Sequence, residues 1–418
     1  MPLSVSNNEC MANRTHIACH ECDLLVQLSH LSEGRKALCP RCGYVLTANH
    51  CNAQDRVIAF SLTALVFLAL SFMFPFLTFS AQGQDSVSTL MQCITVMIAE
   101  NFSSLAILIF ITIIVIPGFY LLSAIYIFVS LKSAQLLPGT HIVMKLIGHL
   151  QHWSMADIFL IGILVSFIKI IALADVGLGL SFWSYVFFIV SMTAAILHID
   201  EYQVWQWIKE KENLPASSVP ENGYYQGCHV CTEIVDVSKK VCETCGAHLH
   251  LRKKNSVQQT WALLITSVIL YLPANLLPIM HTNFLGEETA NTILGGVLVL
   301  WEHGSYPIAL IIFIASVLVP VGKIIALGWL CYSIQTKSKK SCQQKTWLYR
   351  VTDLVGRWSM VDVFVVAVLV ALIKLGNIMS IYPGWGALAF ASMVIATVLA
   401  ALSFDPRLIW DPINKEKV

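Results

Sequence analysis

Eight of the thirteen cysteines stand in four CxxC pairs, a spacing that is typical of metal binding. Each half of the chain holds two consecutive pairs, separated by sixteen residues in the first half and by ten in the second. A CxxC segment can form a tight turn that points both sulfurs at one ion, so two turns supply the four thiolates of a structural zinc site. We therefore expect two zinc sites, although the spacing leaves iron open. The expected ligands are Cys19, Cys22, Cys39 and Cys42 for one site and Cys228, Cys231, Cys242 and Cys245 for the other.

A second set of reactive residues lies inside apolar stretches, where ionisable side chains are costly unless they have a partner or a use. The motif WSMxD occurs twice, at Trp153–Asp157 and at Trp358–Asp362, and corresponding residues are 205 positions apart. Lys169 and Lys374 follow the motifs at the same offset, and Lys323 lies in another apolar stretch. The repeat predicts two related membrane helices over 146–169 and 351–374. Lys169 and Lys374 also suit simple anchors at the far membrane face.

Depth in the membrane indicates which of these groups meet. At 1.5 Å per residue, Lys323 lies about 13 Å and Asp362 about 7 Å from the membrane face that is rich in lysine and arginine. A lysine side chain can cover that difference, so we expect the two to pair, with Ser359 on the same helical face as Asp362. With Thr397 they form a polar cluster that changes protonation state or touches a polar headgroup in transit, unless it is only a structural ion pair. The weaker first-half counterparts are Ser154, Asp157 and Lys169, and Tyr120 stands at the position of Lys323.

The composition indicates a polytopic membrane protein that holds these residues in transmembrane helices. Of the 418 residues, 56% are hydrophobic and 12% are charged, whereas about a quarter of residues are charged in a typical soluble protein. The mean hydropathy of +0.70 agrees with this class. Apolar stretches predict eight spans at 57–79, 102–129, 155–176, 180–199, 260–281, 305–332, 358–375 and 384–404.

The chain is organised as a tandem duplication. An all-α membrane unit of four spans occurs twice, and a small zinc ribbon with four cysteines precedes each copy. Because each unit has an even number of spans, the two copies run parallel. The predicted units are a zinc ribbon at 1–55, a membrane unit at 56–205, a linker at 206–221, a second ribbon at 222–256, a second membrane unit at 257–405 and a tail at 406–418.

Positive charges set the predicted orientation. Of the 26 lysines and arginines, three fall within spans, and the other 23 lie on the side that holds both ribbons and both termini. The loops at 80–101 and 282–304 contain none. We therefore place the ribbons and both termini in the cytoplasm, where thiolates stay reduced, and expect polar loops on the opposite side.

Common catalytic motifs are missing from the sequence. It contains no GxxxxGK[ST], no HExxH and no GxSxG, which are signatures of phosphate binding, zinc proteolysis and serine hydrolysis. We expect no enzymatic activity and no nucleic-acid partner.

Several motifs together resemble the paraquat-inducible protein A family of Gram-negative inner membranes. They are the two CxxC…CxxC ribbons, the repeated WSMxD, LPANLLPI at Leu272–Ile279, GRWSMVDVFV at Gly356–Val365 and FDPRLIWD at Phe404–Asp411. The resemblance covers nearly the whole chain. It implies a multi-pass protein of the bacterial inner membrane that works with a periplasmic MCE-domain partner. Together they are expected to move phospholipids between the inner and outer membranes and to support envelope integrity.

The same resemblance implies zinc in both ribbons and a polar network in the second membrane half. By motif position, its counterparts here are Lys323, Ser359, Asp362 and Thr397. A proton-linked cycle through Asp362 and Lys323 is one hypothesis for the energy source. Two alternatives stay open: a membrane scaffold or redox-responsive sensor with the CxxC pairs as thiol switches, and an exporter of small molecules.

Overall fold

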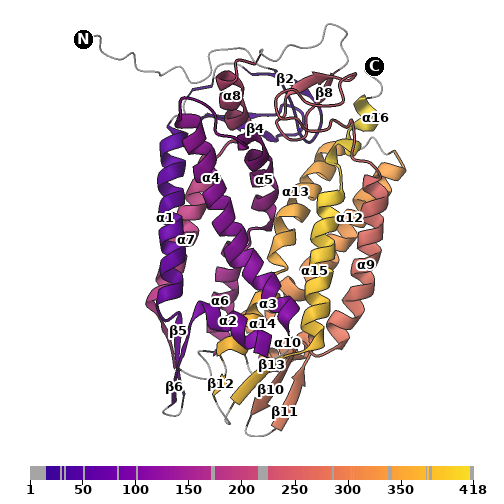
Figure 1. The fold of residues 1–418 in the computed structure, drawn as a ribbon. Coiled ribbons are helices and arrows are strands. Elements are labelled where there is room, and N and C mark those ends of the chain that lie inside the picture. The colour runs from indigo at the N-terminus through magenta and orange to yellow at the C-terminus, as the bar shows by residue number, and fades with distance from the viewer. Residues whose placement is uncertain are drawn as a thin grey trace, which may run out of the picture.

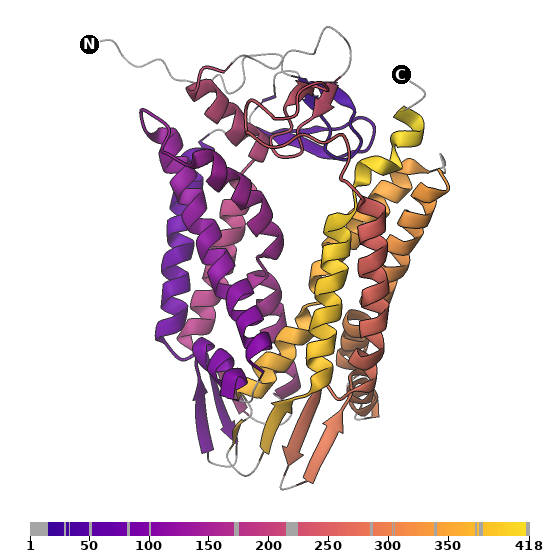
Figure 2. The same ribbon diagram turned by 45° about the vertical axis from the view of Figure 1, so that its right-hand side comes forward.

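The chain forms two helical bundles that stand side by side in the computed structural model, with both cysteine-rich ribbons at one end and short β-sheets at the other (Figure 1). Figure 2 shows the same arrangement after a turn of 45°. The structure describes residues 16–28, 31–32, 34–49, 52–81, 84–99, 102–170, 175–214, 225–284, 287–302, 304, 306–337, 341–372, 374–375 and 379–414.

The two halves build their bundles from helices in the same order. The first-half helices are α1 (Ala53–Met73), α2 (Leu90–Ala99), α3 (Ser103–Phe110), α4 (Ile116–Lys132), α5 (Thr140–Trp153), α6 (Ala156–Ile170), α7 (Leu180–His198) and α8 (Glu201–Lys211). The second-half helices are α9 (Ser256–Leu276), α10 (Ile293–Glu302), α11 (Tyr306–Phe313), α12 (Val319–Gln335), α13 (Cys342–Trp358), α14 (Val361–Leu372), α15 (Trp385–Ser403), the 3-10 turn η3 (Pro406–Ile409) and α16 (Asp411–Asn414). α1 lies along α7 and α4, and α9 lies in the same way along α15 and α12. The predicted duplication is therefore present in the packing.

Seven helices within the described ranges are long and apolar enough to span a membrane. They correspond to seven of the eight predicted spans. The remaining prediction, at 358–375, corresponds to α14, which has only twelve residues and is followed by a short strand, β12 (Lys374–Leu375). The side chains from Val363 to Val370 are buried, and α14 packs against α6 and α2 of the first half. α14 is thus the buried helix at the contact between the halves.

The contact between α6 and α14 is close and apolar. The Phe159 and Phe364 rings meet edge to face with centroids 5.6 Å apart, a favoured aromatic geometry. A Cβ at Gly162 would lie only 3.0 Å from the Cβ of Phe364, so a glycine permits this approach. The Ser166 hydroxyl donates to Gly162 O at 2.8 Å and to Val365 O at 3.3 Å.

Both predicted helices that contain WSMxD are interrupted, so the expectation of a continuous helix was wrong. α5 ends at Trp153 and α6 begins at Ala156, while α13 ends at Trp358 and α14 begins at Val361. The motif aspartates therefore stand in the first turn of a new helix. Unpaired N–H groups and the helix dipole favour a carboxylate there, which lowers the cost of an aspartate at this depth.

A π-helical turn precedes a proline in the second predicted span of each half. These turns are η1 (Ile111–Val115) and η2 (Ile314–Leu318). Pro117 and Pro320 cannot donate to the carbonyl four residues earlier, and that carbonyl lies within the π-helical turn in both cases. In the first half, Met155 N donates to Thr112 O at 3.4 Å. A carbonyl of η1 thus accepts a hydrogen bond from a main-chain N–H just after the end of α5.

The regions predicted as polar loops, 80–101 and 282–304, contain strands and helices instead. Antiparallel sheets with the strand orders β6-β5-β7 and β11-β10-β13-β12 form at the end opposite the ribbons. The strands are β5 (Leu77–Ala81), β6 (Gln84–Ser88), β7 (Asp175–Leu178), β10 (Met280–Phe284), β11 (Glu287–Asn291), β12 and β13 (Met379–Pro383). β5 and β7 belong to segments almost a hundred residues apart, so their pairing gives no local signal in the sequence.

The ribbons consist of short hairpins that meet in one head at the end of the molecule. Their strands are β1 (His16–Ala18), β2 (Leu25–Gln27), β3 (Lys36–Leu38), β4 (Val45–Ala48), β8 (Tyr225–Gly227) and β9 (Ile234–Asp236). β1 contacts both β8 and β9, which joins the two ribbons.

Candidate functional site

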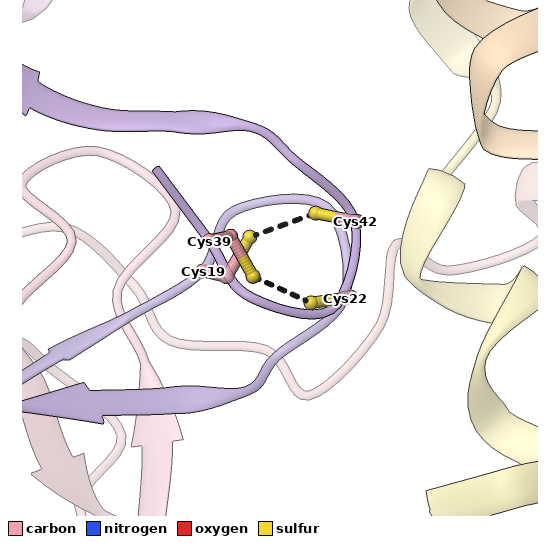
Figure 3. A group of neighbouring side chains, drawn as sticks. All are labelled: Cys19, Cys22, Cys39 and Cys42. Atoms are coloured by element: carbon pink, nitrogen blue, oxygen red, sulfur yellow. Dashed lines mark hydrogen bonds between the residues drawn. The ribbon is translucent and has the colours of Figure 1, made fainter. Parts of the chain in front are cut away.

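The first cysteine cluster gathers four sulfurs from two turns (Figure 3). Cys19 Sγ lies 3.5 Å from Cys42 Sγ, and Cys22 Sγ lies 3.6 Å from Cys39 Sγ. All four sulfurs lie within 4.8 Å of one another. A zinc–sulfur bond of about 2.3 Å gives tetrahedral edges of about 3.8 Å, close to these separations, whereas a disulfide needs about 2.05 Å. The cluster fits one tetrahedral metal ion.

Main-chain hydrogen bonds shape the second turn of this ribbon. Cys39 N donates to Tyr44 O at 2.8 Å and Gly43 N donates to Cys39 O at 2.8 Å. Gly43 has a φ of 72°, a conformation that a glycine adopts without strain. The sequence therefore places a glycine where the second turn needs it.

The second cluster repeats this geometry with fewer residues between its two CxxC pairs. Cys228 Sγ lies 3.5 Å from Cys245 Sγ, and Cys231 Sγ lies 3.5 Å from Cys242 Sγ. All four residues are buried, and Gly246 closes the second turn with a φ of 65°. The structure therefore brings together both predicted ligand sets.

Lys323 is the predicted polar residue whose surroundings the structure describes most fully. Its side chain is only 5% exposed. A Cβ at Gly356 of α13 would collide with its Nζ atom, so the amine lies against the α13 main chain. Among the described residues, Asp353, one turn before Gly356, carries a negative charge that acts on the amine. The sequence had predicted Asp362 as the partner. The Asp362 side chain lies outside the described residues, so that pairing stays a prediction.

The other second-half candidates are buried near this lysine's helix. Ser359 is 1% exposed, and its hydroxyl has no hydrogen-bond partner among the described atoms. Thr397 is also buried, and its hydroxyl donates to Val394 O at 2.7 Å. α12, α13 and α15 contact one another, and α14 contacts α15. The helices that carry the predicted cluster therefore pack together.

The first half has no equivalent cluster among its described side chains. Ser154 is buried and follows the end of α5, while Asp157 is exposed in the first turn of α6. The Lys169 side chain is outside the described set. Tyr120 is fully buried, and its hydroxyl has no hydrogen-bond partner among the atoms described. The halves share an architecture but differ in their buried chemistry.

Sequence reasoning missed Gly356 and Asp353. The available signal was a paired difference between the halves, because Lys323 and Gly356 correspond to Tyr120 and Gln151. A glycine opposite a buried lysine leaves room for the amine, and the first half has neither. Asp353 was overlooked because it precedes the WSMxD motif in a polar stretch.

A known protein family matches both halves of the chain. The family model described as paraquat-inducible protein A matches residues 54–209 and 257–414. The chain belongs to the paraquat-inducible protein A family. It is 42% identical over 401 residues to the intermembrane transport protein PqiA of Escherichia coli strain K12, covering 95% of each chain.

More distant relatives also match over nearly their full length. The lipophilic envelope-spanning tunnel protein A of E. coli strain K12 is 31% identical, over 94% of this chain and 90% of that protein. A probable intermembrane transport protein of Haemophilus influenzae is 28% identical, over 96% of this chain and 97% of that protein. No solved structure matches the chain.

Each of the two matched segments carries, near its end, an aspartate that accepts a main-chain hydrogen bond. Asp200 follows α7 and accepts from Ala48 N at 2.7 Å, and Asp405 follows α15 and accepts from Lys253 N at 3.1 Å. Both donors and both acceptors are 205 residues apart. Each aspartate thus ties the end of a bundle to the segment that enters it.

Asp405 is held in its charged form. Burial acts to raise its pKa, but hydrogen bonds and the positive charge of Arg407, with the main-chain N–H of Lys253, outweigh burial and leave the pKa below its ordinary value. The Arg407 Nε lies 3.1 Å from Asp405 Oδ1. A buried carboxylate with these donors stabilises the junction only while it is ionised.

Proposed function

We propose that this protein is the inner-membrane subunit of a system that moves lipids between the inner and outer membranes. One observation carries the proposal: near-full-length similarity to PqiA, named an intermembrane transport protein, at 42% identity. The name of the more distant relative, a lipophilic envelope-spanning tunnel protein, points to the same lipid-related role. This role is transport rather than catalysis.

A periplasmic MCE-domain protein is the proposed partner, and phospholipids are the proposed cargo. The lysine and arginine distribution supports an orientation with both ribbons and both termini in the cytoplasm. The sheets β6-β5-β7 and β11-β10-β13-β12 then face the periplasm, where such a partner would bind.

Zinc is the proposed metal in both ribbons. Four thiolates at these separations suit tetrahedral zinc, and ribbons this short need a metal to be stable. The cysteines hold the ion, which supplies structure rather than chemistry.

The cluster of Lys323, Ser359, Asp362 and Thr397 is the proposed site where transport is coupled to a change of charge or to a lipid headgroup. The burial of Lys323, Ser359 and Thr397 supports this role, because polar groups at such depth are costly without a use.

A complementation and reconstitution experiment tests the proposal. A strain that lacks this protein is supplied with the wild type, Lys323→Ala or Asp362→Asn at equal expression, and envelope integrity is measured. In parallel, labelled phospholipid transfer is followed from proteoliposomes that hold this chain and its MCE partner. We expect transfer with the wild type and a loss of at least tenfold with both variants. If the wild type transfers lipid only at the protein-free rate, the proposed transport function is contradicted. Full activity of both variants contradicts only the proposed role of the polar cluster.

A further inference from the structure

A small cavity lies where the first half meets the second. It measures about 10 Å³, which is room for one water molecule. His152 of α5 forms its first-half wall, and Lys323, Asp353 and Gly356 line it from the second half. The remaining lining residues, Val398, Ala401 and Leu402, belong to the last turns of α15, which ends at Ser403 on the ribbon side.

The cavity joins an exposed side chain to a buried one. His152 is exposed, Asp353 is half-buried, and Lys323 is 5% exposed. Among the three ionisable side chains that line the cavity, His152 is therefore the most exposed. One water in the cavity can connect the imidazole with the two charged groups behind it, because such a water needs two or more polar partners.

The hydrogen bonding of His152 leaves one ring nitrogen for this contact. Its Nδ1 lies 3.0 Å from Gly148 O, and since a carbonyl only accepts, Nδ1 carries the proton of the neutral ring. Nε2 then has a lone pair that can accept a hydrogen bond or bind a proton. The ring is held in place by the helix main chain and keeps one exchangeable position.

The ionisable groups around His152 come from four helices. Lys323 on α12 and Asp353 on α13 share its cavity. Glu201 on α8 carries a charge that interacts with His152, and a Cβ at Gly148 would lie 3.2 Å from Glu201 Oε1. His149 stands one turn earlier on α5 and does not line the cavity. Charges of both signs therefore surround the imidazole, because Lys323 is a cation and Asp353 and Glu201 are carboxylates.

We propose that His152 is the proton-exchange group through which solution at the ribbon side reaches the Lys323–Asp353 pair. A proton leaves the Nε2–H bond of His152 and, through one water, forms an O–H bond on the Asp353 carboxylate, and His152 is then reprotonated from solution. The net charge of the Lys323–Asp353 pair rises by one. The first half thereby controls the charge state of a site built in the second.

The relay is built only once in the duplicated chain. The residue that corresponds to His152 is Arg357, which does not release its proton at physiological pH, and the residue that corresponds to Lys323 is Tyr120. The asymmetry of the halves therefore gives each a distinct task, one exchanging protons with solution and the other holding the charges that respond.

Histidine NMR in lipid nanodiscs tests the coupling directly and does not require transport. The full chain, labelled at histidine, is titrated as wild type, Lys323→Met and Asp353→Asn, with the His152 signals assigned by His152→Gln. Loss of the cation should raise the His152 midpoint by about one pH unit, and loss of the carboxylate should lower it by a similar amount. His149 is the internal control and should move much less. A His152 midpoint that neither variant shifts overturns the inference.

A functional comparison tests the consequence, and this step rests on the proposed function. His152→Gln should abolish the pH dependence of phospholipid transfer, whereas His149→Gln, an exposed histidine with the same Nδ1 bond to a main-chain carbonyl, should keep it. Identical pH profiles for the wild type and both variants contradict the relay. If the wild type transfers no lipid at any pH, the proposed function fails, while the titration still decides the inference.

Discussion

At the scale of single residues, the buried Lys323 side chain fits into the second half because the residue that it contacts on α13 is a glycine. The Lys323 amine lies against the main chain of α13 because Gly356 has no side chain. The charge of Asp353 acts from one turn away, which offsets part of the cost of removing an ammonium group from water. The glycine that leaves room for the amine and the carboxylate that opposes its charge both lie on α13. The position of the lysine therefore depends on this one helix.

Gly356→Ala tests this dependence. The added methyl group should overlap the Lys323 amine and lower the stability of the protein by about 1–3 kcal/mol, the usual cost of overpacking. Thermal unfolding in detergent measures the change. The double variant with Lys323→Ala should cost less than the sum of the two single changes, since the overlap is then removed. Gly322→Ala is the control, because nothing lies within 4 Å of a Cβ there. Additive effects would show that the two residues do not interact.

Asp405 makes a second residue-scale prediction. Its pKa lies below the ordinary value, so its stabilisation is present above the pKa of the unfolded chain and is lost as the pH falls through the folded-state pKa. Asp405→Asn should cost about 2 kcal/mol at neutral pH, as expected for hydrogen bonds to a charged group. The difference in melting temperature from the wild type should shrink as the pH falls through the ordinary range of an aspartate, about pH 4, and below.

The control for this change is Asp236→Asn. Asp236 accepts from Ser238 N at 2.8 Å but is not part of a junction between bundle and ribbon. We expect a much smaller loss of stability for it. An Asp405→Asn difference that stays constant from neutral to strongly acidic pH would contradict the account of a depressed pKa.

At the scale of elements, the sequence predicted the features that depend on local signals. Apolar length identified seven spans, and CxxC spacing identified both clusters of four cysteines, because each signal is read within a few dozen residues. The interruption at WSMxD was missed because serine and methionine are compatible with a continuous helix. In the first half, the break between α5 and α6 coincides with a contact to η1, because Met155 N donates a hydrogen bond to Thr112 O. The strand pair β5–β7 was missed for a similar reason, since its partners are distant in the chain.

The surroundings of Lys323 illustrate the same limit for the site. Depth along ideal helices favours Asp362 as its partner, which stays a prediction. It gave no indication of Gly356 and Asp353 of α13, which the structure places beside the lysine. Helix periodicity ranks candidates along one element, whereas a contact between three elements depends on their packing.

The two ribbons predict a metal stoichiometry. Elemental analysis of the purified wild type should find two zinc ions per chain, and Cys22→Ser or Cys231→Ser should each leave one, since a cluster with three thiolates binds far more weakly. Cys331→Ser is the control, because Cys331 is buried in α12 and belongs to neither cluster. Metal-free protein whose CxxC pairs oxidise reversibly would favour the redox-sensor alternative.

At the scale of the whole molecule, the two ribbons form one head above both bundles (Figure 2). Their contacts are crossed, because each ribbon bonds to the half of the chain that the other ribbon precedes. The first ribbon bonds to the second half, where Arg350 Nε lies 3.0 Å from Glu21 Oε1 and Arg350 Nη2 donates to Cys42 O at 3.0 Å. The second ribbon bonds to the first half, where Lys209 and Glu233 form an ion pair at 2.6 Å. Lys145, which corresponds to Arg350, lies near Gly246 of the second ribbon. The crossing ties the halves together through the two cysteine-rich ribbons.

This crossing predicts where the loss of each metal is felt. In Cys22→Ser the first ribbon loses its ion, so amide hydrogen exchange should rise in α13, on the second bundle, around Arg350. In Cys231→Ser exchange should rise in α8, on the first bundle, around Lys209. Exchange mass spectrometry at peptide resolution measures both. Asp200 also joins β4 of the first ribbon to the start of α8, so the decisive regions are the middle of α13 and the end of α8. If each variant instead loosened only the bundle that follows its own ribbon in sequence, the halves would be coupled through helix contacts such as those of α14 with α6 and α2, and not through the ribbons.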